Sequence, residues 1–272
     1  MIWLTAGKKL WWQEHTRPEI LERARKCDIA MLPIGAIEQH GEHLTTGEDC
    51  WHAIKIAERV AEKTDVMLLP CPWYGAHPYL HWFYPGTIPL RFETFMNLLV
   101  DVVRGAAVAG YNKFIIFNCH GEEWAVPPVV QQLGLEGYFV VAPTLWEIAK
   151  TTLNEVLETP FMHADEAETS LGLYLVPDLV DMSKAKDETP DYLIEKKWFV
   201  GPGGIIQDKM PWYVATFTQP EYKHLKHGVV GHATRGTAEK GRKVVEAAVQ
   251  WLVTFIEELK AKYPPGVKPP VK

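Results

Sequence analysis

Two short stretches of the sequence bring together side chains that bind metal ions. In the first, Glu38 and His40 follow a short apolar run and are separated by one residue. In the second, His120 and Glu122 follow another apolar run with the same separation. Because side chains two residues apart on an extended chain point to the same side, each pair can converge on one small volume. The two pairs predict a site built from imidazole nitrogens and carboxylate oxygens.

Asp49 adds a further carboxylate, just before a stretch of helical periodicity. Two histidines and three carboxylates exceed what one tetrahedral zinc with an open position can use. They suit two divalent ions about 3.5–4 Å apart that share a bridging carboxylate. Such a pair lowers the pKa of a bound water towards neutrality and polarises a carbonyl group. The chemistry that these residues predict is therefore hydrolysis of a carbonyl compound.

Short, nearly all-apolar runs alternate along the chain with longer stretches of helical period. This alternation is typical of a mostly parallel sheet covered by helices. The runs predict strands at residues 28–34, 66–69, 113–118 and 138–142. The helical stretches predict helices at residues 18–26, 51–63, 91–110, 123–133, 145–157, 166–176 and 237–263. In open α/β sheets the functional crevice lies outside the carboxyl ends of the strands, where both metal-binding pairs would lie.

We therefore expect an α/β fold, a three-layer α/β/α single domain over residues 1–262. Residues 178–232 carry Gly, Pro and scattered aromatics and predict an irregular excursion or short antiparallel strands. Residues 263–272 form a Pro-rich tail that we expect to be loosely held.

The composition favours a small-molecule partner. The chain has 272 residues, of which 47% are hydrophobic, and can bury one large core. Its formal net charge of −6 argues against a nucleic-acid or anionic-membrane partner, since phosphate binding relies on clustered Lys and Arg. The four cysteines are isolated, which suits a reducing compartment. We expect a cytoplasmic protein with no nucleic-acid and no membrane partner.

These motifs resemble those of the creatininase (creatinine amidohydrolase) family. Residues 32–44 with Asp49 resemble the family signature E-Q-H-G-x-H-L…D, and residues 118–122 resemble its second metal motif. Further similar segments lie at residues 83–87, 163–170 and 237–241, in the family's order and spread over almost the whole chain. The resemblance implies an α/β/α fold and assembly as a homohexamer.

The resemblance also implies a ligand set. Glu38, Asp49 and His120 would hold one ion. His40, Asp49 and Glu122 would hold the other, so that Asp49 is the bridge. The cofactor would be two divalent ions per subunit, with zinc as the first choice and manganese, iron or magnesium as alternatives.

Four other residues are candidates for catalysis and substrate binding. The resemblance implies that His163 carries protons to the substrate and that Glu168 supports the catalytic site. It also implies that Trp146 contacts the substrate. His81 precedes the segment 83–87, which makes it a candidate substrate contact as well.

The remaining histidines receive simpler interpretations. His43 is expected to orient the first motif or a metal ligand. A pocket role and a structural role are equally open for His77. A structural role is expected for His15, His52, His224 and His227.

The substrate is expected to differ from creatinine. Thr159 and Gly121 stand where creatininase has aromatic residues beside its substrate. The first expectation is hydrolysis of a C–N bond in a cyclic amide or formamide, with water activated by the two ions attacking the carbonyl. The alternative is ring opening at a C–C bond of a cyclic diketone such as a keto-inositol. A non-catalytic metal-binding protein ranks third, because a structural zinc site needs only four ligands and no proton carrier.

Overall fold

The computed structural model describes residues 8–189, 199–200, 210–211 and 225–271. Four parallel strands form the central sheet in the order β2-β1-β3-β4. The strands are β1 Ile29–Ile34, β2 Met67–Leu68, β3 Lys113–Asn118 and β4 Phe139–Val141. The helices are α1 Arg17–Lys26, α2 Glu48–Thr64, α3 Phe92–Val108, α4 Val126–Leu135, α5 Leu145–Ile148, α6 Lys150–Val156, α7 Glu166–Leu175 and α8 Ala238–Lys262.

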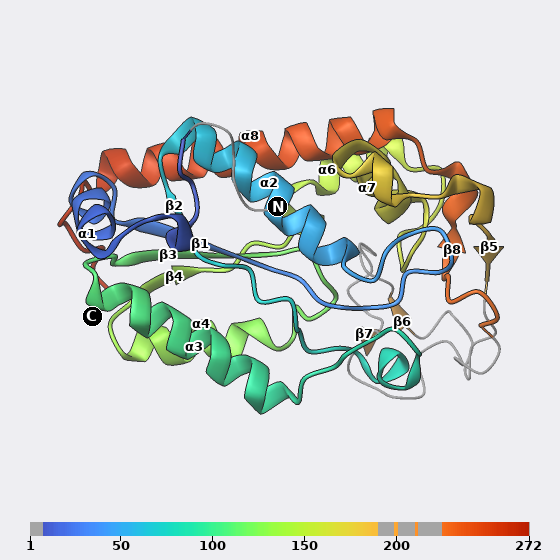
Figure 1. Cartoon of the computed structure of the whole chain (residues 1–272), viewed down its shortest axis with the longest axis horizontal. Helices are drawn as coiled ribbons and strands as arrows, with labels where there is room; N and C mark the ends of the chain where they lie inside the picture. The colour runs from blue at the N-terminus through green and yellow to red at the C-terminus, as the bar shows by residue number, and fades with distance from the viewer. Residues whose placement is uncertain (1–7, 190–198, 201–209, 212–224, 272) are drawn as a thin grey trace.

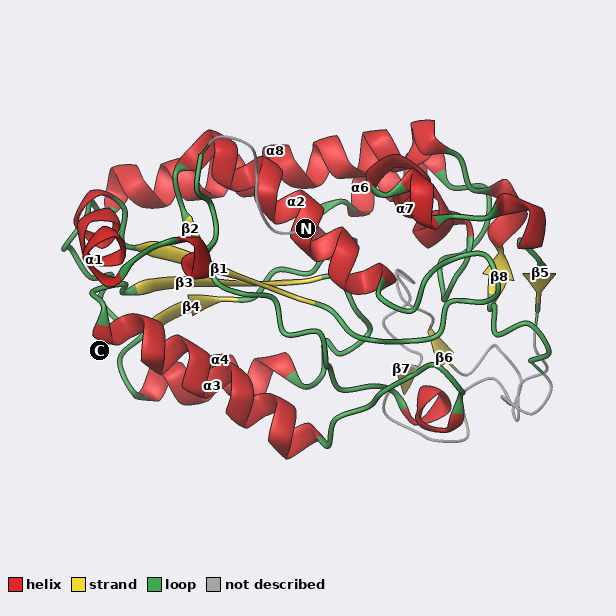
Figure 2. Cartoon of the chain, viewed as in Figure 1, coloured by secondary structure: helices red, strands yellow, loops and turns green. Residues whose placement is uncertain are grey.

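The helices form two layers, one on each face of this sheet. Figure 2 shows α2 and α8 above the strands and α3 and α4 below them. Alternate residues of β1 supply the two cores: Met31 packs with residues of α2, α7 and α8, whereas Leu32 packs with residues of α3 and α4. All six residues of β1 and all six of β3 are buried, as expected for strands covered on both faces. The expected α/β/α architecture is confirmed.

The expected elements all form, with three larger changes in helix bounds. The helix expected at 51–63 begins at Glu48, so Asp49 lies in its first turn and not before it. The helix expected at 123–133 begins at Val126, because Pro127 and Pro128 lack a backbone N–H and fit only the first helical turn. The helix expected at 145–157 is divided at Ala149 into α5 and α6. No helix in the described ranges is long and apolar enough to cross a membrane.

The segment at 178–232 is described only in part. The strands β5 Asp187–Glu188 and β8 Gly231–His232 pair antiparallel, which confirms part of the expectation. The strands β6 Phe199–Val200 and β7 Met210–Pro211 pair parallel, and this was not expected. The rest of the expectation falls on residues 190–198, 201–209 and 212–224, which lie outside the described residues.

The amino edge of the sheet holds the C-terminal tail. Lys113 is fully buried, and its Nζ lies 2.6 Å from Asp28 Oδ1. The second oxygen of Asp28 accepts a hydrogen bond of 2.8 Å from the backbone N–H of Gly266, and Pro269 is buried. The expectation of a loose tail is therefore wrong at these positions, because the buried carboxylate needs a second donor.

The carboxyl edge of the sheet positions the metal-competent residues. Ile34 and Asn118 end β1 and β3 in register, so the loops that follow leave the sheet side by side. The first of these loops runs against the start of α2. A Cβ on Gly35 would lie only 2.6 Å from the backbone carbon of Asp49, so a residue without a side chain is needed at this position. This close approach brings Asp49 to the loop that carries Glu38 and His40.

Candidate active site

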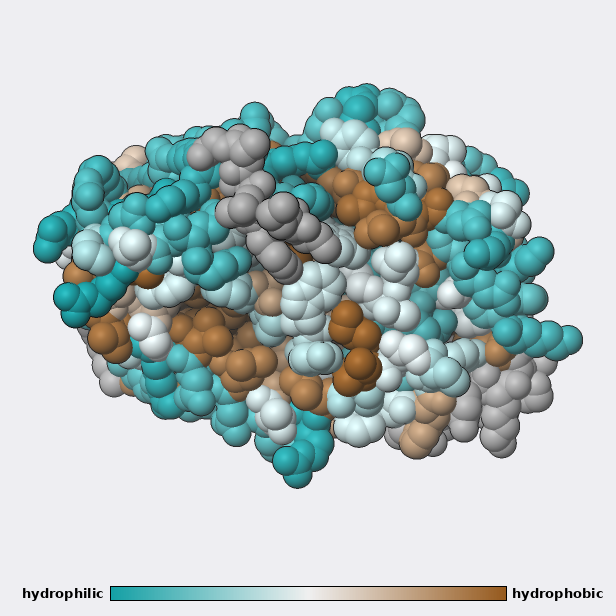
Figure 3. Space-filling model, in the orientation of Figure 1, coloured by the Kyte–Doolittle hydropathy of each residue, from teal (hydrophilic) through white to brown (hydrophobic). Residues whose placement is uncertain are grey.

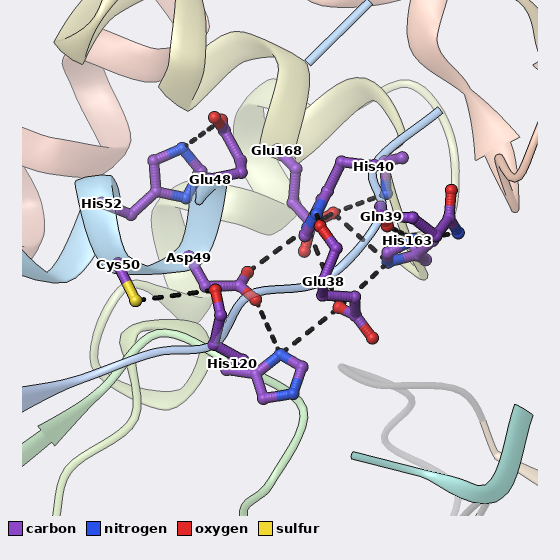
Figure 4. A network of polar contacts seen from close by, with 12 residues as sticks. Glu38, Gln39, His40, Glu48, Asp49, Cys50, His52, His120, His163 and Glu168 are labelled. Atoms are coloured by element: carbon purple, nitrogen blue, oxygen red, sulfur yellow. Dashed lines mark hydrogen bonds and ion pairs between the residues drawn. The ribbon is translucent and has the colours of Figure 1, made fainter. Parts of the chain in front are cut away.

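The site is built from segments that meet at this carboxyl edge (Figure 4). Glu38 and His40 lie on the loop after β1, and Asp49 lies in the first turn of α2. His120 follows β3, and Glu168 lies in the first turn of α7. All five side chains are buried, so their polar atoms depend on one another or on a ligand.

Asp49 lies between two histidines, as Figure 4 shows. Its Oδ2 is 2.8 Å from His120 Nδ1, and its Oδ1 is 3.3 Å from His40 Nε2. Glu38 Oε2 lies 3.4 Å from His120 Nδ1, and Glu168 Oε2 lies 3.4 Å from His40 Nε2. The geometry gives two groups that share Asp49: one with Glu38 and His120, the other with His40 and Glu168.

The tautomers of both histidines are set by backbone carbonyl groups. His40 Nδ1 donates to the carbonyl oxygen of Glu38 at 3.0 Å, and His120 Nε2 donates to that of Ala76 at 3.1 Å. In a neutral imidazole the other nitrogen then carries a lone pair, and in both residues it faces carboxylate oxygens. His40 Nε2 and Asp49 Oδ2 are buried and have no hydrogen-bond partner among the described residues. A divalent cation satisfies both atoms, so the donor set fits metal ions.

The electrostatics of the group also favour added positive charge. Burial alone lowers the pKa of His120, but the carboxylates of Glu38 and Asp49 raise it to about 10. Burial likewise lowers the pKa of His40, and the carboxylates of Asp49 and Glu168 more than compensate, so the pKa lies well above its usual value. For Asp49, burial raises the pKa, but the two histidines hold it below its usual range. The carboxylates therefore create a strongly negative site.

His163 also lies beside the carboxylates of Glu38 and Glu168. Its Nε2 donates to the carbonyl oxygen of Gln39 at 2.8 Å. Its Nδ1 lies 3.6 Å from Glu38 Oε2 and 3.9 Å from Glu168 Oε2. Burial and the neighbouring His81 hold the pKa of His163 well below its usual value. A neutral imidazole with its free nitrogen towards the site can accept and return a proton.

Gln39 is a site residue that the sequence analysis missed. Its backbone carbonyl holds His163, and its side-chain amide donates to the carbonyl oxygen of Gly228 at 2.9 Å. The sequence did contain an indication of this role. Gln39 lies between Glu38 and His40, and on an extended segment its side chain must point to the side opposite theirs. It connects the metal-binding loop to the proton-carrying residue.

Glu122 makes no ion pair with His40 among the described residues, although Asp49 and His120 lie near enough to affect its pKa. Its Oε2 accepts a hydrogen bond of 2.9 Å from the backbone N–H of Ala76. Burial raises its pKa to about 8, which favours the protonated carboxyl group. The spacing argument assumed an extended chain, but the backbone bends at His120 and Gly121, and this turns the two side chains apart. Glu168 Oε2 lies beside His40, whereas Glu122 Oε1 is buried without a hydrogen-bond partner among the described residues, so the ligand role of Glu122 stays a prediction.

The two candidate substrate contacts lie in different surroundings. Trp146 is buried in the core, and its ring packs against that of Phe161 at a centroid distance of 4.1 Å and an interplanar angle of 33°. His81 lies at the site, with Nδ1 2.8 Å from Glu38 Oε1. His77 lies beside it, with Nδ1 3.4 Å from the same oxygen.

The other histidines make contacts outside this group. His43 Nε2 lies 2.8 Å from the Thr169 hydroxyl and connects the first motif to α7. His52 is buried 2.6 Å from Glu48, and His227 lies 3.2 Å from Glu42. His15 contacts the carbonyl oxygen of Trp11. His224 lies outside the described residues.

Comparison with known proteins decides the family. The model of the Creatininase family, described as creatinine amidohydrolase, matches residues 13–256. This chain belongs to the creatininase family. A solved structure of creatinine amidohydrolase (creatininase) superposes with a TM-score of 0.75 at 25% identity, covering 95% of this chain and all of that one.

Two curated relatives show how activities vary among similar chains. The 3-dehydro-scyllo-inosose hydrolase of Thermotoga maritima is 33% identical, covering 97% of this chain and 88% of that protein. The creatinine amidohydrolase of Pseudomonas putida is 26% identical, covering 94% of this chain and 96% of that protein. A manganese form of creatininase is among the similar solved structures, at 25% identity over 95% of this chain and with a TM-score of 0.75. This creatininase-family chain is a metal-dependent hydrolase whose buried clusters fit divalent ions.

Proposed function

We propose that this chain opens the ring of a polyhydroxylated cyclic diketone by hydrolysing a C–C bond. The observation that carries the proposal is the 33% identity, over 97% of the chain, to a hydrolase named for 3-dehydro-scyllo-inosose. That name denotes a diketo-inositol, a ring with many hydroxyl groups. The imidazoles of His77 and His81 beside Glu38 support the choice, because hydroxyl groups need hydrogen-bonding partners.

C–C hydrolysis requires a leaving carbon that can hold an electron pair. In a ring with two ketones separated by one carbon, water adds to one carbonyl carbon and the adjacent C–C bond breaks. The bonding electrons pass into the enolate of the second ketone, and a proton then adds to that carbon. The product is an open-chain keto carboxylate. Stabilising the developing negative charge is the main demand on the site.

The residues of the site divide this task. Glu38, Asp49 and His120 would hold one divalent ion, and His40, Asp49 and Glu168 the second. When bound, the ions would lower the pKa of water and polarise the ketone. His163 Nδ1 faces Glu38 and Glu168 and would carry the proton from the attacking water to the leaving carbon.

Glutamine substitutions test this ligand set. Glu168→Gln is expected to lower the metal content by up to one ion per chain, because Glu168 Oε2 contacts His40 Nε2. Glu122→Gln is the matched variant and is expected to keep both ions, since its carboxyl group bonds to the Ala76 N–H. The measurement is metal analysis after gel filtration. Loss of metal from Glu122→Gln with full occupancy in Glu168→Gln would restore the ligand set inferred from sequence.

Hydrolysis of a C–N bond is the second candidate. It is supported by the 26% identity to creatinine amidohydrolase over 94% of this chain. Both candidates use the same metal and proton-carrying residues and differ in the leaving atom.

A substrate panel separates the two candidates. The zinc- or manganese-loaded protein is incubated with 3-dehydro-scyllo-inosose, creatinine, a lactam and a formamide. We expect the diketone to be hydrolysed with a kcat/KM at least about 100-fold above that for creatinine, because buried polar groups discriminate strongly against a ring without hydroxyls. Comparable turnover of creatinine would favour the second candidate.

Assembly and location complete the proposal. A cytoplasmic homo-oligomer, with a hexamer as the family resemblance implies, would cover apolar side chains that are exposed in the single chain. Tyr74, Phe83 and Ile88 are each about half exposed. Figure 3 shows hydrophobic residues reaching the surface on one face, among hydrophilic ones.

A further inference from the structure

Two buried histidines lie beside the site without a place in either ligand group. His77 is fully buried and His81 is 6% exposed. His81 belongs to the short 3₁₀ helix Tyr79–Phe83, and His77 lies just before it. Both follow β2 in the chain.

Glu38 lies between the two histidines and the two proposed ligand groups, and each histidine also forms a possible metal-binding set with it: His77 with Glu38 and His120, and His81 with Glu38 and His163. Its Oε2 faces His120 at 3.4 Å and His163 at 3.6 Å. Its Oε1 faces His81 at 2.8 Å and His77 at 3.4 Å. One carboxylate therefore has a metal-facing oxygen and an oxygen that orients these two imidazoles.

One of the two imidazoles has unused hydrogen-bonding capacity. His77 Nε2 is buried and makes no hydrogen bond with a described residue, whereas His81 Nδ1 has the Glu38 carboxylate as its partner at 2.8 Å. Buried polar atoms without a partner are uncommon in folded proteins, so His77 Nε2 indicates a ligand that supplies the partner.

The ring contacts indicate where that ligand would lie. The ring of His77 packs edge-on against His120, with a centroid distance of 4.7 Å. The ring of His81 packs edge-on against His163, with a centroid distance of 4.4 Å. A small molecule that contacts both imidazoles would therefore also lie close to the residues that would bind metal and carry protons.

We infer that His77 and His81 form a subsite that binds hydroxyl groups of the substrate ring. This inference rests on the proposed function and specifies the substrate class as a ring with hydroxyls next to the carbonyl under attack. A neutral imidazole offers one donor and one acceptor, which matches a hydroxyl group. The two histidines determine specificity, and the hydrolytic step itself uses His163 and the metal-competent residues.

The test compares two diketones on the metal-loaded protein. One is 3-dehydro-scyllo-inosose and the other is 2,2-dimethylcyclohexane-1,3-dione, which has no hydroxyl groups and cannot enolise between its two carbonyls. His77→Leu is expected to lower kcat/KM for the polyhydroxylated ring by about 10- to 100-fold, chiefly through KM, the usual effect of leaving a buried hydrogen-bonding group unpaired. The loss for 2,2-dimethylcyclohexane-1,3-dione is expected to be at least about tenfold smaller. His77→Gln, which keeps a donor and an acceptor, is expected to recover part of the loss.

Two further measurements keep the result interpretable. Metal content is measured in each variant, and a loss of metal from His77→Leu would overturn the inference, because His77 would then act through Glu38. Equal losses for the two diketones would overturn it as well. His81→Leu is tested in the same way, in case His77→Leu does not fold.

Binding distinguishes this inference from the proposed function. Titration calorimetry with scyllo-inosose, a ring with one ketone, measures binding without turnover. If the wild-type protein opens neither diketone, the proposed function is wrong, and the calorimetry still decides the subsite. Weaker binding of scyllo-inosose to both His77→Leu and His81→Leu supports the subsite, whereas unchanged binding overturns it.

Discussion

Asp49→Ala is expected to abolish hydrolysis and to remove at least one divalent ion per chain. Asp49 contacts both histidines, with its Oδ2 towards His120 and its Oδ1 towards His40. Removing it takes a ligand from both proposed ion positions and leaves His40 and His120 without the carboxylate that they share. We expect turnover to fall by at least about 10³-fold, beyond the usual loss of one charge-stabilising group. Metal analysis and initial rates are the two measurements.

The control for Asp49 must be an acidic residue of the same helix that is exposed. Glu48 is unsuitable, because it is buried and lies 2.6 Å from His52. Glu62 is exposed in α2, and Glu62→Ala is expected to keep both activity and metal. Full metal occupancy in Asp49→Ala would contradict the bridging role.

His163→Asn is expected to lower kcat by roughly 10²–10⁴, the usual contribution of a positioned acid or base. The reason is its orientation: Nε2 is held by the Gln39 carbonyl, which leaves Nδ1 facing the carboxylates of Glu38 and Glu168. Metal content is expected to stay unchanged, because each proposed ion keeps its three ligands. Steady-state kinetics and metal analysis of the same preparation test this.

A distant histidine provides the control for His163. His15 precedes α1 and contacts the carbonyl oxygen of Trp11, so His15→Asn is expected to leave kcat and metal content unchanged. If His163→Asn lost metal, His163 would be a ligand, and the proton would need another carrier.

The central sheet, and the edge of it that carries the site, could be predicted from the sequence. Both depend on the pattern of apolar residues within short segments. The apolar runs at 29–34 and 113–118 are long enough to identify buried strands, and parallel strands place their carboxyl ends at one edge. The sequence therefore predicted that Glu38, His40 and Asp49 would lie together at that edge, and they do so in the structure.

The positions of Glu122 and Glu168 could not be predicted in the same way. The bend at His120 and Gly121 changes which way Glu122 points, and the pattern of residue types gives no sign of it. Glu168 reaches His40 only because α7 packs beside α2, a contact between segments far apart in the sequence. Non-local packing therefore decides which carboxylate completes the second group.

Trp146 shows a related difficulty. A tryptophan after a strand end is equally compatible with a substrate wall and with the core. The structure places it in the core against Phe161, a residue whose partner could not be read from spacing. The contact of the tail residue Gly266 with Asp28 is equally non-local.

The most direct test of the central claim is the structure of the product formed in isotopically labelled water. The metal-loaded protein is incubated with 3-dehydro-scyllo-inosose in water enriched in ¹⁸O, and the product is examined by mass spectrometry and NMR. We predict an open-chain keto carboxylate with one ¹⁸O atom in the new carboxylate and, in a parallel reaction in ²H₂O, solvent-derived deuterium on the former ring carbon beside the second ketone. Recovery of the unchanged diketone, while the same preparation hydrolyses a cyclic amide or a formamide, would contradict C–C ring opening.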